Sequence, residues 1–236
     1  MNIKYDLHTH LIPMIDDGAQ SVEESLMLIE ELSNQGIENI VFTPHFYTHK
    51  ESAEDFVLRR NEAYKEIRNL IPDYLNVKLG AEVYVTDYLF AEERDLRPLC
   101  IEGTNYMITE FSYDSDFSGG SMRRLLKLIG LGYIPIIPHV ERYPALIKKK
   151  SKLDELIDMG VLIQSNFISF AEKGKSRKLL KLLNSGYIHI LSTDVHNLSR
   201  NAPDSISKAM EIISKKCSFD IINSLNQNAR DVFEGR

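Results

Sequence analysis

The sequence has no tryptophan and only two cysteines among its 236 residues, Cys100 and Cys217. Two isolated cysteines cannot make a disulfide framework, and neither sits in a CxxC pair. Neither is followed by arginine six residues later, so the phosphate-binding loop of enzymes with a cysteine nucleophile is absent. The GxSxG serine motif and the GxxxxGK[ST] phosphate loop are also missing. Covalent catalysis by serine or cysteine therefore has little support.

The sequence also lacks positive charge in excess and long apolar runs. Its net charge of -6 and pI of about 5.7 argue against nucleic acid as the main partner. An anionic substrate would need local positive charge from metal ions or a few arginines. No window approaches about 18 uncharged apolar residues, and the start MNIKYDLHTH has no signal-peptide core. We therefore expect a cytoplasmic protein with no membrane insertion.

Short apolar stretches alternate with helical patterns along the whole chain. Ser21 is a helix N-cap, with Glu24 completing a capping box and Gly36 ending that helix. Expected strands are residues 3–7, 39–43, 77–82, 106–111, 134–139, 161–165 and 188–192, and further helices are 53–70, 122–131, 152–159, 177–184, 205–215 and 219–233. This order predicts a parallel α/β fold with outer helices, and seven strands favour a barrel over a doubly wound open sheet. With no repeat or composition break, residues 1–236 are expected to form a single domain.

Six of the seven expected strands run into a histidine, aspartate or glutamate. His8 and His10 stand two residues apart, so both imidazoles face the same side of an extended segment. The turn that follows contains two aspartates, of which we choose Asp17 as a ligand. The other candidates are His45, Glu82, Glu110, His139, Asp194 and His196. In a parallel barrel these strand ends share one rim and converge on one pocket.

Each candidate alone also has an ordinary structural explanation. A single histidine often lies at the surface, and a carboxylate in an apolar strand can pair with a buried arginine or lysine. Together the nine residues are five histidines and four carboxylates without a thiolate. Such ligands suit manganese, iron, zinc or magnesium, and nine exceed the needs of one ion. We therefore expect two or three metal ions and a pocket that attracts phosphate.

These motifs together resemble a known superfamily. The HTH pair, the DDG turn, TPH, GAE, the strand ending in EF, PHVER and DVH are similar to the PHP (polymerase and histidinol phosphatase) superfamily. Within it the chain most resembles the metal-dependent tyrosine-protein phosphatases of bacterial capsular and exopolysaccharide systems, the CpsB/CapC type. The resemblance extends from His8 to the segment 228–230. The motifs are specific jointly, whereas each triplet alone is not.

The resemblance implies a distorted seven-stranded, TIM-like barrel that binds manganese through the nine residues above. It implies that Arg142 and Arg200 bind phosphate, although an exposed structural charge also explains Arg200. The expected reaction is direct hydrolysis of phosphotyrosine by metal-activated water. Either His45 or His196 is expected to protonate the leaving group, in competition with metal binding. The expected partner is an autophosphorylating bacterial tyrosine kinase, through its tyrosine-rich tail.

Other functions fit the same residues. Histidinol phosphate, another small phosphomonoester or a nucleic-acid 3′ end would use the same site, and a regulatory metal-binding module would use it without turnover. Tyr47, Phe117 and Tyr143 are candidates to stack on a substrate ring, although loop aromatics usually pack on neighbours. Residues 148–150, three lysines, are expected in a solvated loop that can also dock an acidic peptide.

Overall fold

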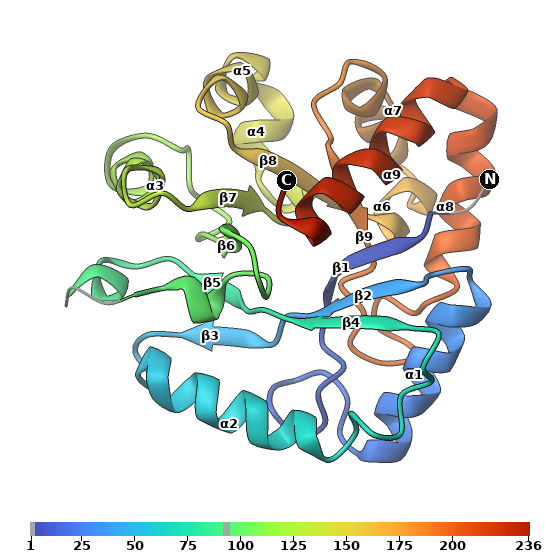
Figure 1. The fold of residues 1–236 in the computed structure, drawn as a ribbon. Helices are drawn as coiled ribbons and strands as arrows, with labels where there is room; N and C mark the ends of the chain where they lie inside the picture. Colours follow the sequence, from blue (N-terminus) through green and yellow to red (C-terminus); the bar gives the residue numbers. More distant parts are fainter. Residues whose placement is uncertain (1–2, 92–94) are drawn as a thin grey trace.

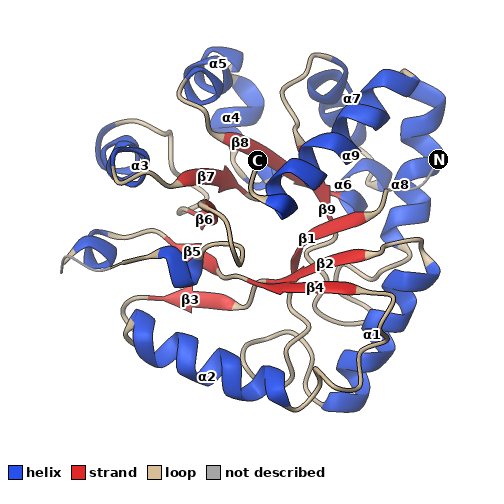
Figure 2. Ribbon diagram, viewed as in Figure 1, coloured by secondary structure: helices blue, strands red, loops and turns tan. Residues whose placement is uncertain are grey.

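The computed structural model describes residues 3–91 and 95–236. All strand pairings in these residues are parallel, as predicted, and helices surround the strands (Figures 1 and 2). One sheet has the order β1-β2-β4 and the other β3-β5-β6-β7-β8-β9. The strands are β1 (Tyr5–Thr9), β2 (Asn39–Phe42), β3 (His45–Tyr47), β4 (Asn76–Leu79), β5 (Glu82–Tyr84), β6 (Tyr106–Glu110), β7 (Ile134–Ile137), β8 (Leu162–Asn166) and β9 (Ile190–Ser192).

Two of the expected strands are interrupted shortly before or at a candidate ligand. The stretch 39–43 ends as β2 at Phe42, and β3 begins at His45 after Pro44. The stretch 77–82 is likewise divided into β4 and β5, with Glu82 beginning the second piece. Because β2 pairs with β4 and β3 with β5, the two breaks lie side by side. Proline cannot donate a ladder hydrogen bond, which accounts for the first break.

The first strand lies two residues later than predicted, and its register against β2 shifts between Asp6 and Thr9. Leu7 packs in an apolar cluster between strands, whereas its neighbour His8 faces Glu82 and Asp194. Strict alternation would send two successive side chains to opposite faces. An irregular register of this kind re-aims a side chain, and here it brings His8 to the polar end of the sheet.

The ends of the first and last strands lie next to each other. Thr9 forms a parallel bridge with Val195. The Asp194 amide donates to the His8 carbonyl at 2.9 Å, and the His10 amide donates to the Val195 carbonyl at 2.9 Å. These bonds connect the HTH and DVH motifs, which most of the chain separates in sequence.

The helices follow the predicted order with some differences at their ends. They are α1 (Val22–Asn34), α2 (Ala53–Lys65), α3 (Gly119–Gly130), α4 (Pro144–Lys148), α5 (Lys150–Asp158), α6 (Phe167–Ala171), α7 (Ser176–Asn184), α8 (Ser205–Lys216) and α9 (Phe219–Glu234). The Ser21 hydroxyl accepts from the Glu24 amide at 3.1 Å, as expected of an N-cap. The sequence did not predict α4 and α6, since five residues are too few to show a period. The expected lysine loop is therefore wrong in part, because Lys148 ends α4 and Lys150 begins α5.

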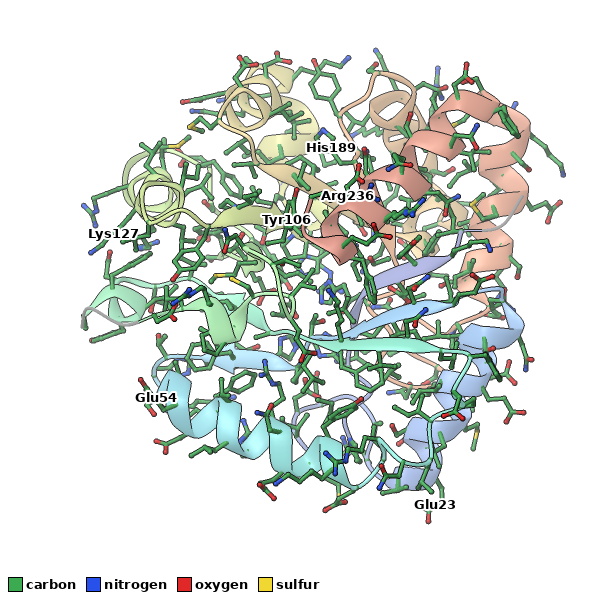
Figure 3. The ribbon with its side chains drawn as sticks, viewed as in Figure 1. Glu23, Glu54, Tyr106, Lys127, His189 and Arg236 are labelled. Carbon is green, nitrogen blue, oxygen red and sulfur yellow. The ribbon has the colours of Figure 1, made fainter. Side chains whose placement is uncertain are left out.

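One face of the strand assembly is closed by the C-terminal helix. Leu7, Val41, Ile136 and Ile190 form an inner apolar cluster that includes Phe233 of α9. The Tyr106 hydroxyl donates to the Arg236 carbonyl at 2.7 Å, and Figure 3 shows these two residues together. With α9 over the amino ends of the strands, the polar strand ends lie at the opposite mouth. No helix of the described residues is long and apolar enough to cross a membrane.

Candidate metal centre

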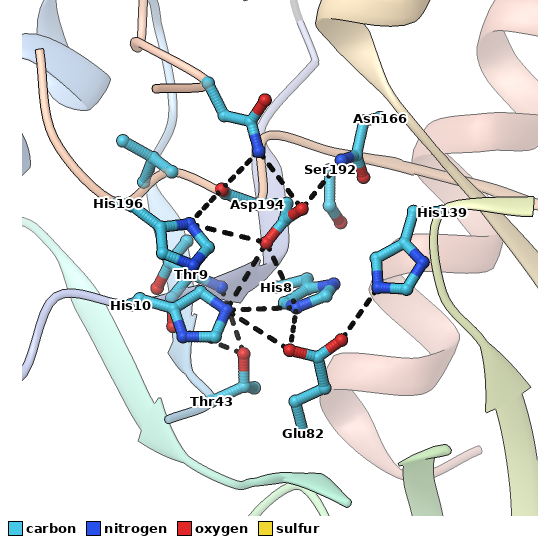
Figure 4. A network of polar contacts seen from close by, with 12 residues as sticks. His8, Thr9, His10, Thr43, Glu82, His139, Asn166, Ser192, Asp194 and His196 are labelled. Atoms are coloured by element: carbon cyan, nitrogen blue, oxygen red, sulfur yellow. Dashed lines mark hydrogen bonds and ion pairs between the residues drawn. The ribbon is translucent and has the colours of Figure 1, made fainter. Parts of the chain in front are cut away.

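The structure brings the nine predicted ligands into one cluster at the carboxyl ends of the strands. Figure 4 shows part of it, with His8, His10, Glu82, His139, Asp194 and His196. Eight of them fall into three overlapping groups whose potential ligand atoms lie within 4.8 Å of one another. The groups are His8–His10–Glu82–Asp194, His10–Asp17–His45–His196 and His45–Glu82–Glu110. His139, the ninth, has Nε2 at 2.8 Å from Glu82 Oε1 and 3.7 Å from Glu110 Oε1.

Five of the six distances between the four potential ligand atoms of the first group are nearly equal. Nε2 of His8 and Nε2 of His10 are 3.3 Å apart. Glu82 Oε2 lies 3.3 and 3.4 Å from these two nitrogens, and Asp194 Oδ1 lies 3.5 and 3.3 Å from them. The centre of a regular tetrahedron with edges of about 3.4 Å lies about 2.1 Å from each corner, a typical Zn–N or Zn–O bond length. The spacing therefore fits a divalent ion.

The hydrogen bonds of the histidines also fit a metal. Nδ1 of His8 faces Gln164 Oε1 at 3.3 Å, and Nδ1 of His10 faces Asp16 Oδ2 at 2.8 Å. Nδ1 of His196 faces the Asp194 carbonyl at 2.8 Å. An acceptor at Nδ1 holds the tautomer whose Nε2 lone pair is free, as in carboxylate–histidine–metal arrangements. In each case Nε2 faces the cluster.

Several buried atoms of the cluster have no hydrogen-bond partner among the described residues. They include Nε2 of His196, Nδ1 of His45 and Oε2 of Glu82. The last two lie only 2.8 Å apart, yet their relative orientation does not make a hydrogen bond. Buried polar atoms without partners are costly, and two such atoms aimed at common space are typical of metal ligands.

The Asp-Asp-Gly turn separates its two carboxylates. Asp17 Oδ1 lies 3.4 Å from Nε2 of His45 and 3.5 Å from Nε2 of His196. Asp16 instead binds His10 Nδ1 and accepts from the His45 amide at 3.0 Å, so it orients two of the histidines. The turn packs closely on β1, since a Cβ at Gly18 would lie 2.1 Å from the His10 carbonyl oxygen. Only glycine fits there.

The two predicted arginines contact different parts of the cluster. Arg142 Nη2 donates to Asp194 Oδ2 at 2.9 Å, and its Nη1 donates to the Tyr113 hydroxyl at 2.9 Å. Arg200 forms an ion pair with Asp17 and is half-exposed. Both guanidinium groups therefore contact carboxylates of the cluster, Arg142 that of Asp194 and Arg200 that of Asp17.

Sequence reasoning missed the residues that hold the ligands in place. Tyr113 donates to Glu110 Oε1 at 2.6 Å. Asn166 Nδ2 and Asn201 Nδ2 donate to Asp194 Oδ2 at 2.8 and 3.1 Å. The position of Asn166 at the end of the one strand without a ligand was a usable signal. Tyr113 and Asn201 lie in loops, where spacing carries no such signal.

Mutual charge sets the protonation of the cluster. Burial alone would raise the pKa of Glu82, but His8 and His45 outweigh burial and bring its pKa well below the usual range. Burial lowers the pKa of His45, yet Glu82 and Asp17 outweigh it and raise the pKa to about 9. Burial and the neighbouring Glu82 raise the pKa of Glu110. Burial and His10 lower the pKa of His196 to about 4. A metal ion held by His45 would therefore have to displace a proton from it at neutral pH.

Two of the candidate ligands have unusual backbone conformations. His139 has a φ of 35° and Asp194 has a φ of 56°, both in the left-handed region. Such conformations cost about 1–3 kcal/mol in residues other than glycine and concentrate at functional sites. The surrounding bonds compensate: the His139 amide donates to Gln164 Oε1 at 2.9 Å. The strain turns both side chains from the strand direction toward the cluster.

A recess opens beside the cluster. Its volume is about 840 Å³, and its lining includes Asp17, His45, Tyr47, Lys50 and Arg59. His45 is partly exposed there, whereas His196 is buried. The other two aromatic residues predicted to stack on a substrate, Phe117 and Tyr143, are wholly buried in the core. For these two, the alternative that loop aromatics pack on neighbouring side chains is confirmed, and stacking on a substrate is not.

Solved structures share the fold. A chain from the crystal structures of YwqE of Bacillus subtilis and CpsB of Streptococcus pneumoniae, described as metal-dependent tyrosine phosphatases, aligns with a TM-score of 0.79 and 24% identity over 98% of this chain and 95% of that one. A TatD family hydrolase from Entamoeba histolytica aligns with a TM-score of 0.57 and 13% identity over 98% of both chains. The chain therefore has the same parallel α/β fold as these two structures.

Sequence comparison identifies the family. Residues 4–234 match the family described as capsular polysaccharide synthesis, CpsB/CapC. The chain is 33% identical over 225 residues to the tyrosine-protein phosphatase CpsB of Streptococcus pneumoniae, which covers 89% of this chain and 90% of that protein. It is 28% identical over 229 residues to the tyrosine-protein phosphatase YwqE of Bacillus subtilis, with 95% and 89% covered. The protein therefore belongs to the CpsB/CapC family, as its motifs predicted.

Proposed function

We propose that this protein is a metal-dependent phosphatase that removes phosphate from phosphotyrosine in a protein of capsular or exopolysaccharide synthesis. The observation that carries the proposal is the buried cluster of nine histidines and carboxylates with Arg142 bonded at its edge. The names of the relatives, tyrosine-protein phosphatases, support tyrosine as the leaving group.

We propose that the nine residues hold two or three ions, preferably manganese, with iron, zinc or magnesium as alternatives. The three overlapping groups support this number, and Glu82 belongs to two of them. Bound ions would supply an activated water and positive charge for the phosphate. The proposed ligands are His8, His10, Asp17, His45, Glu82, Glu110, His139, Asp194 and His196.

The remaining side chains have roles in binding the phosphate and the leaving group. Arg142 uses two of its five N–H donors for Tyr113 and Asp194, which leaves the others for phosphate oxygens. Arg200, paired with Asp17, would bind a further phosphate oxygen. Of the two histidines considered as proton donors, His45 is better placed, because it borders the recess where a leaving group fits.

Turnover of a substrate panel tests this function. Purified protein with manganese, zinc or magnesium is assayed on a phosphotyrosine peptide, a phosphoserine peptide, histidinol phosphate and single-stranded DNA. We expect the phosphotyrosine peptide to be the best substrate, and His139→Ala to abolish metal-dependent turnover. Faster hydrolysis of histidinol phosphate would replace the proposed substrate, and inactivity with every metal would favour a regulatory metal-binding module.

We further propose that the two sheets act as one distorted seven-stranded barrel, with residues 1–236 as one domain. The bridge from Thr9 to Val195 and the chain continuity from β2 to β3 and from β4 to β5 support this reading.

Free Cys100 and Cys217 support a cytoplasmic location. The proposed substrate is the tyrosine-rich tail of an autophosphorylating kinase. A phosphorylated peptide from such a tail can be added to the substrate panel described above.

A further inference from the structure

We propose that the recess beside Asp17 and His45 binds the phenyl ring of the substrate phosphotyrosine, that Tyr47 recognises this ring, and that Lys50 binds an acidic residue next to it. This inference rests on the proposed function, because it needs a phosphate group held at the metal cluster. It adds the part of the site that recognises the leaving group and its neighbours.

The recess has the position and size required. Two proposed ligands, Asp17 and His45, line it, so a phosphate at the cluster would direct its ester substituent into this space or along its edge. The volume of about 840 Å³ lies in the range of pockets that bury a whole small-molecule ligand. A tyrosyl ring and parts of the flanking peptide therefore fit.

Tyr47, the last residue of β3, lines the recess beside His45. It stands two residues after His45 in β3, so both side chains emerge on the same face. The two ring centroids are 5.4 Å apart, and Tyr84 supports the Tyr47 ring from 5.8 Å. Tyr113 is instead committed to Glu110 and Arg142 by its hydroxyl. An incoming phenyl ring beside His45 would therefore meet Tyr47 first.

Lys50 supplies the charge in the recess. Its ammonium group lies 4.4 Å from the centroid of the Tyr47 ring and forms no ion pair with any residue in 3–91 or 95–236. Arg59, the other cation of the lining, is paired with Glu51 and donates to the Ile15 carbonyl at 2.8 Å. Lys50 is exposed and flexible, so it can leave the Tyr47 ring and reach a carboxylate of the substrate peptide.

Ligand binding to the manganese-loaded full-length protein tests the ring subsite. Calorimetry compares phenylphosphonate with methylphosphonate and inorganic phosphate, which share the anionic head but lack the ring. We expect phenylphosphonate to bind more tightly than methylphosphonate. Tyr47→Leu should raise the Kd of phenylphosphonate about 2- to 10-fold, the size of an aromatic contact, and leave the Kd of phosphate unchanged. Tyr74→Leu, at an exposed position outside the recess, is the matched control.

Three results would overturn the ring subsite. One is equal affinity of the wild-type protein for phenylphosphonate and methylphosphonate, which needs no variant. Another is an unchanged Kd of phenylphosphonate in Tyr47→Leu. The third is a parallel rise in the Kd of phosphate, which would mean that Tyr47 acts through His45. Failure of the proposed function looks different, because the wild-type protein would then hydrolyse no phosphotyrosine peptide with any metal.

Lys50→Gln tests the charged part of the subsite. The Kd of a non-hydrolysable phosphotyrosine analogue peptide with acidic neighbours should rise about 3-fold, and less so at high salt, because a surface ion pair is lost. The same peptide with alanine neighbours should bind both proteins equally. An equal change for the two peptides would contradict a role for Lys50 in recognising acidic residues.

Discussion

Replacing Glu82 with glutamine should remove more metal from this protein than replacing Asp17 with asparagine, because Glu82 belongs to two of the three metal-binding groups and Asp17 to one. Glutamine keeps the size of the side chain and one oxygen but loses the charge. Glu82 is the first residue of β5, and its side chain is buried. The change therefore tests the cluster without opening a cavity.

The expected magnitude follows from the contacts of the two carboxylate oxygens. Oε1 faces His139 at 2.8 Å, and Oε2 faces His8, His10 and His45 at 3.3, 3.4 and 2.8 Å. Glu82 belongs to two of the three groups that can hold a metal. Losing it should weaken two ions together. Even residues that only orient a ligand change metal affinity by about 10–100-fold, so a shared ligand should cost at least that much for each ion.

Metal content after dialysis, measured by plasma mass spectrometry, tests this reasoning, with turnover of a phosphotyrosine peptide as the second readout. Asp17→Asn is the matched control, because Asp17 belongs to one group alone. We expect Glu82→Gln to lose about twice as many ions as Asp17→Asn and to lose turnover. A Glu82→Gln protein that keeps the wild-type metal content would refute the shared role of this carboxylate.

Three further predictions follow from the site. Asp16→Asn should lower metal affinity about 10–100-fold while Asp17 stays in place, because Asp16 orients His10; unchanged affinity in a metal titration would contradict this. Tyr113→Phe should weaken phosphate inhibition several-fold, since the hydroxyl holds Arg142, and should also lower metal affinity, since the same hydroxyl donates to Glu110. In metal-free protein, His45 adds about 3 kcal/mol of stability below pH about 6.5 that is lost as pH rises through about 9. Denaturant titrations with chelator should show this decline, and a flat profile over that range would count against it.

The predicted alternation of parallel strands and helices is confirmed, and most elements lie close to their predicted positions, because these features depend on local periodicity. Helices α7 and α9 begin and end within one residue of the predicted bounds. The strand bounds were wrong where tertiary contacts decide the hydrogen bonding. Pro44 and the paired breaks before His45 and Glu82 depend on the neighbouring strand. The register shift in β1 is also a property of the pair, not of one segment.

The candidate ligands could be named from the sequence because strand ends in a parallel sheet converge, whatever the details of packing. The sequence gives no physical reason to choose Asp17 over Asp16, because adjacent carboxylates differ only in the direction of their side chains. The structure shows that Asp17 faces His45 and His196, whereas Asp16 binds Nδ1 of His10. The bond of Asn166 could not be predicted, because its partner Asp194 lies 28 residues later in the chain. Tyr113 and Asn201 lie near their partners in the chain, but in loops, where the sequence does not reveal the direction of a side chain.

By itself, the sequence determined the family, the parallel α/β order and the types of side chain at each strand end. These depend on composition, periodicity and motifs, which are local. The tertiary structure alone decided how those side chains meet: which atoms of His8, His10, Glu82 and Asp194 stand about 3.4 Å apart, which acceptors hold the imidazoles, and where the recess with Tyr47 opens. Distances and orientations between remote segments arise only when the strands pack, so no single stretch of the chain encodes them.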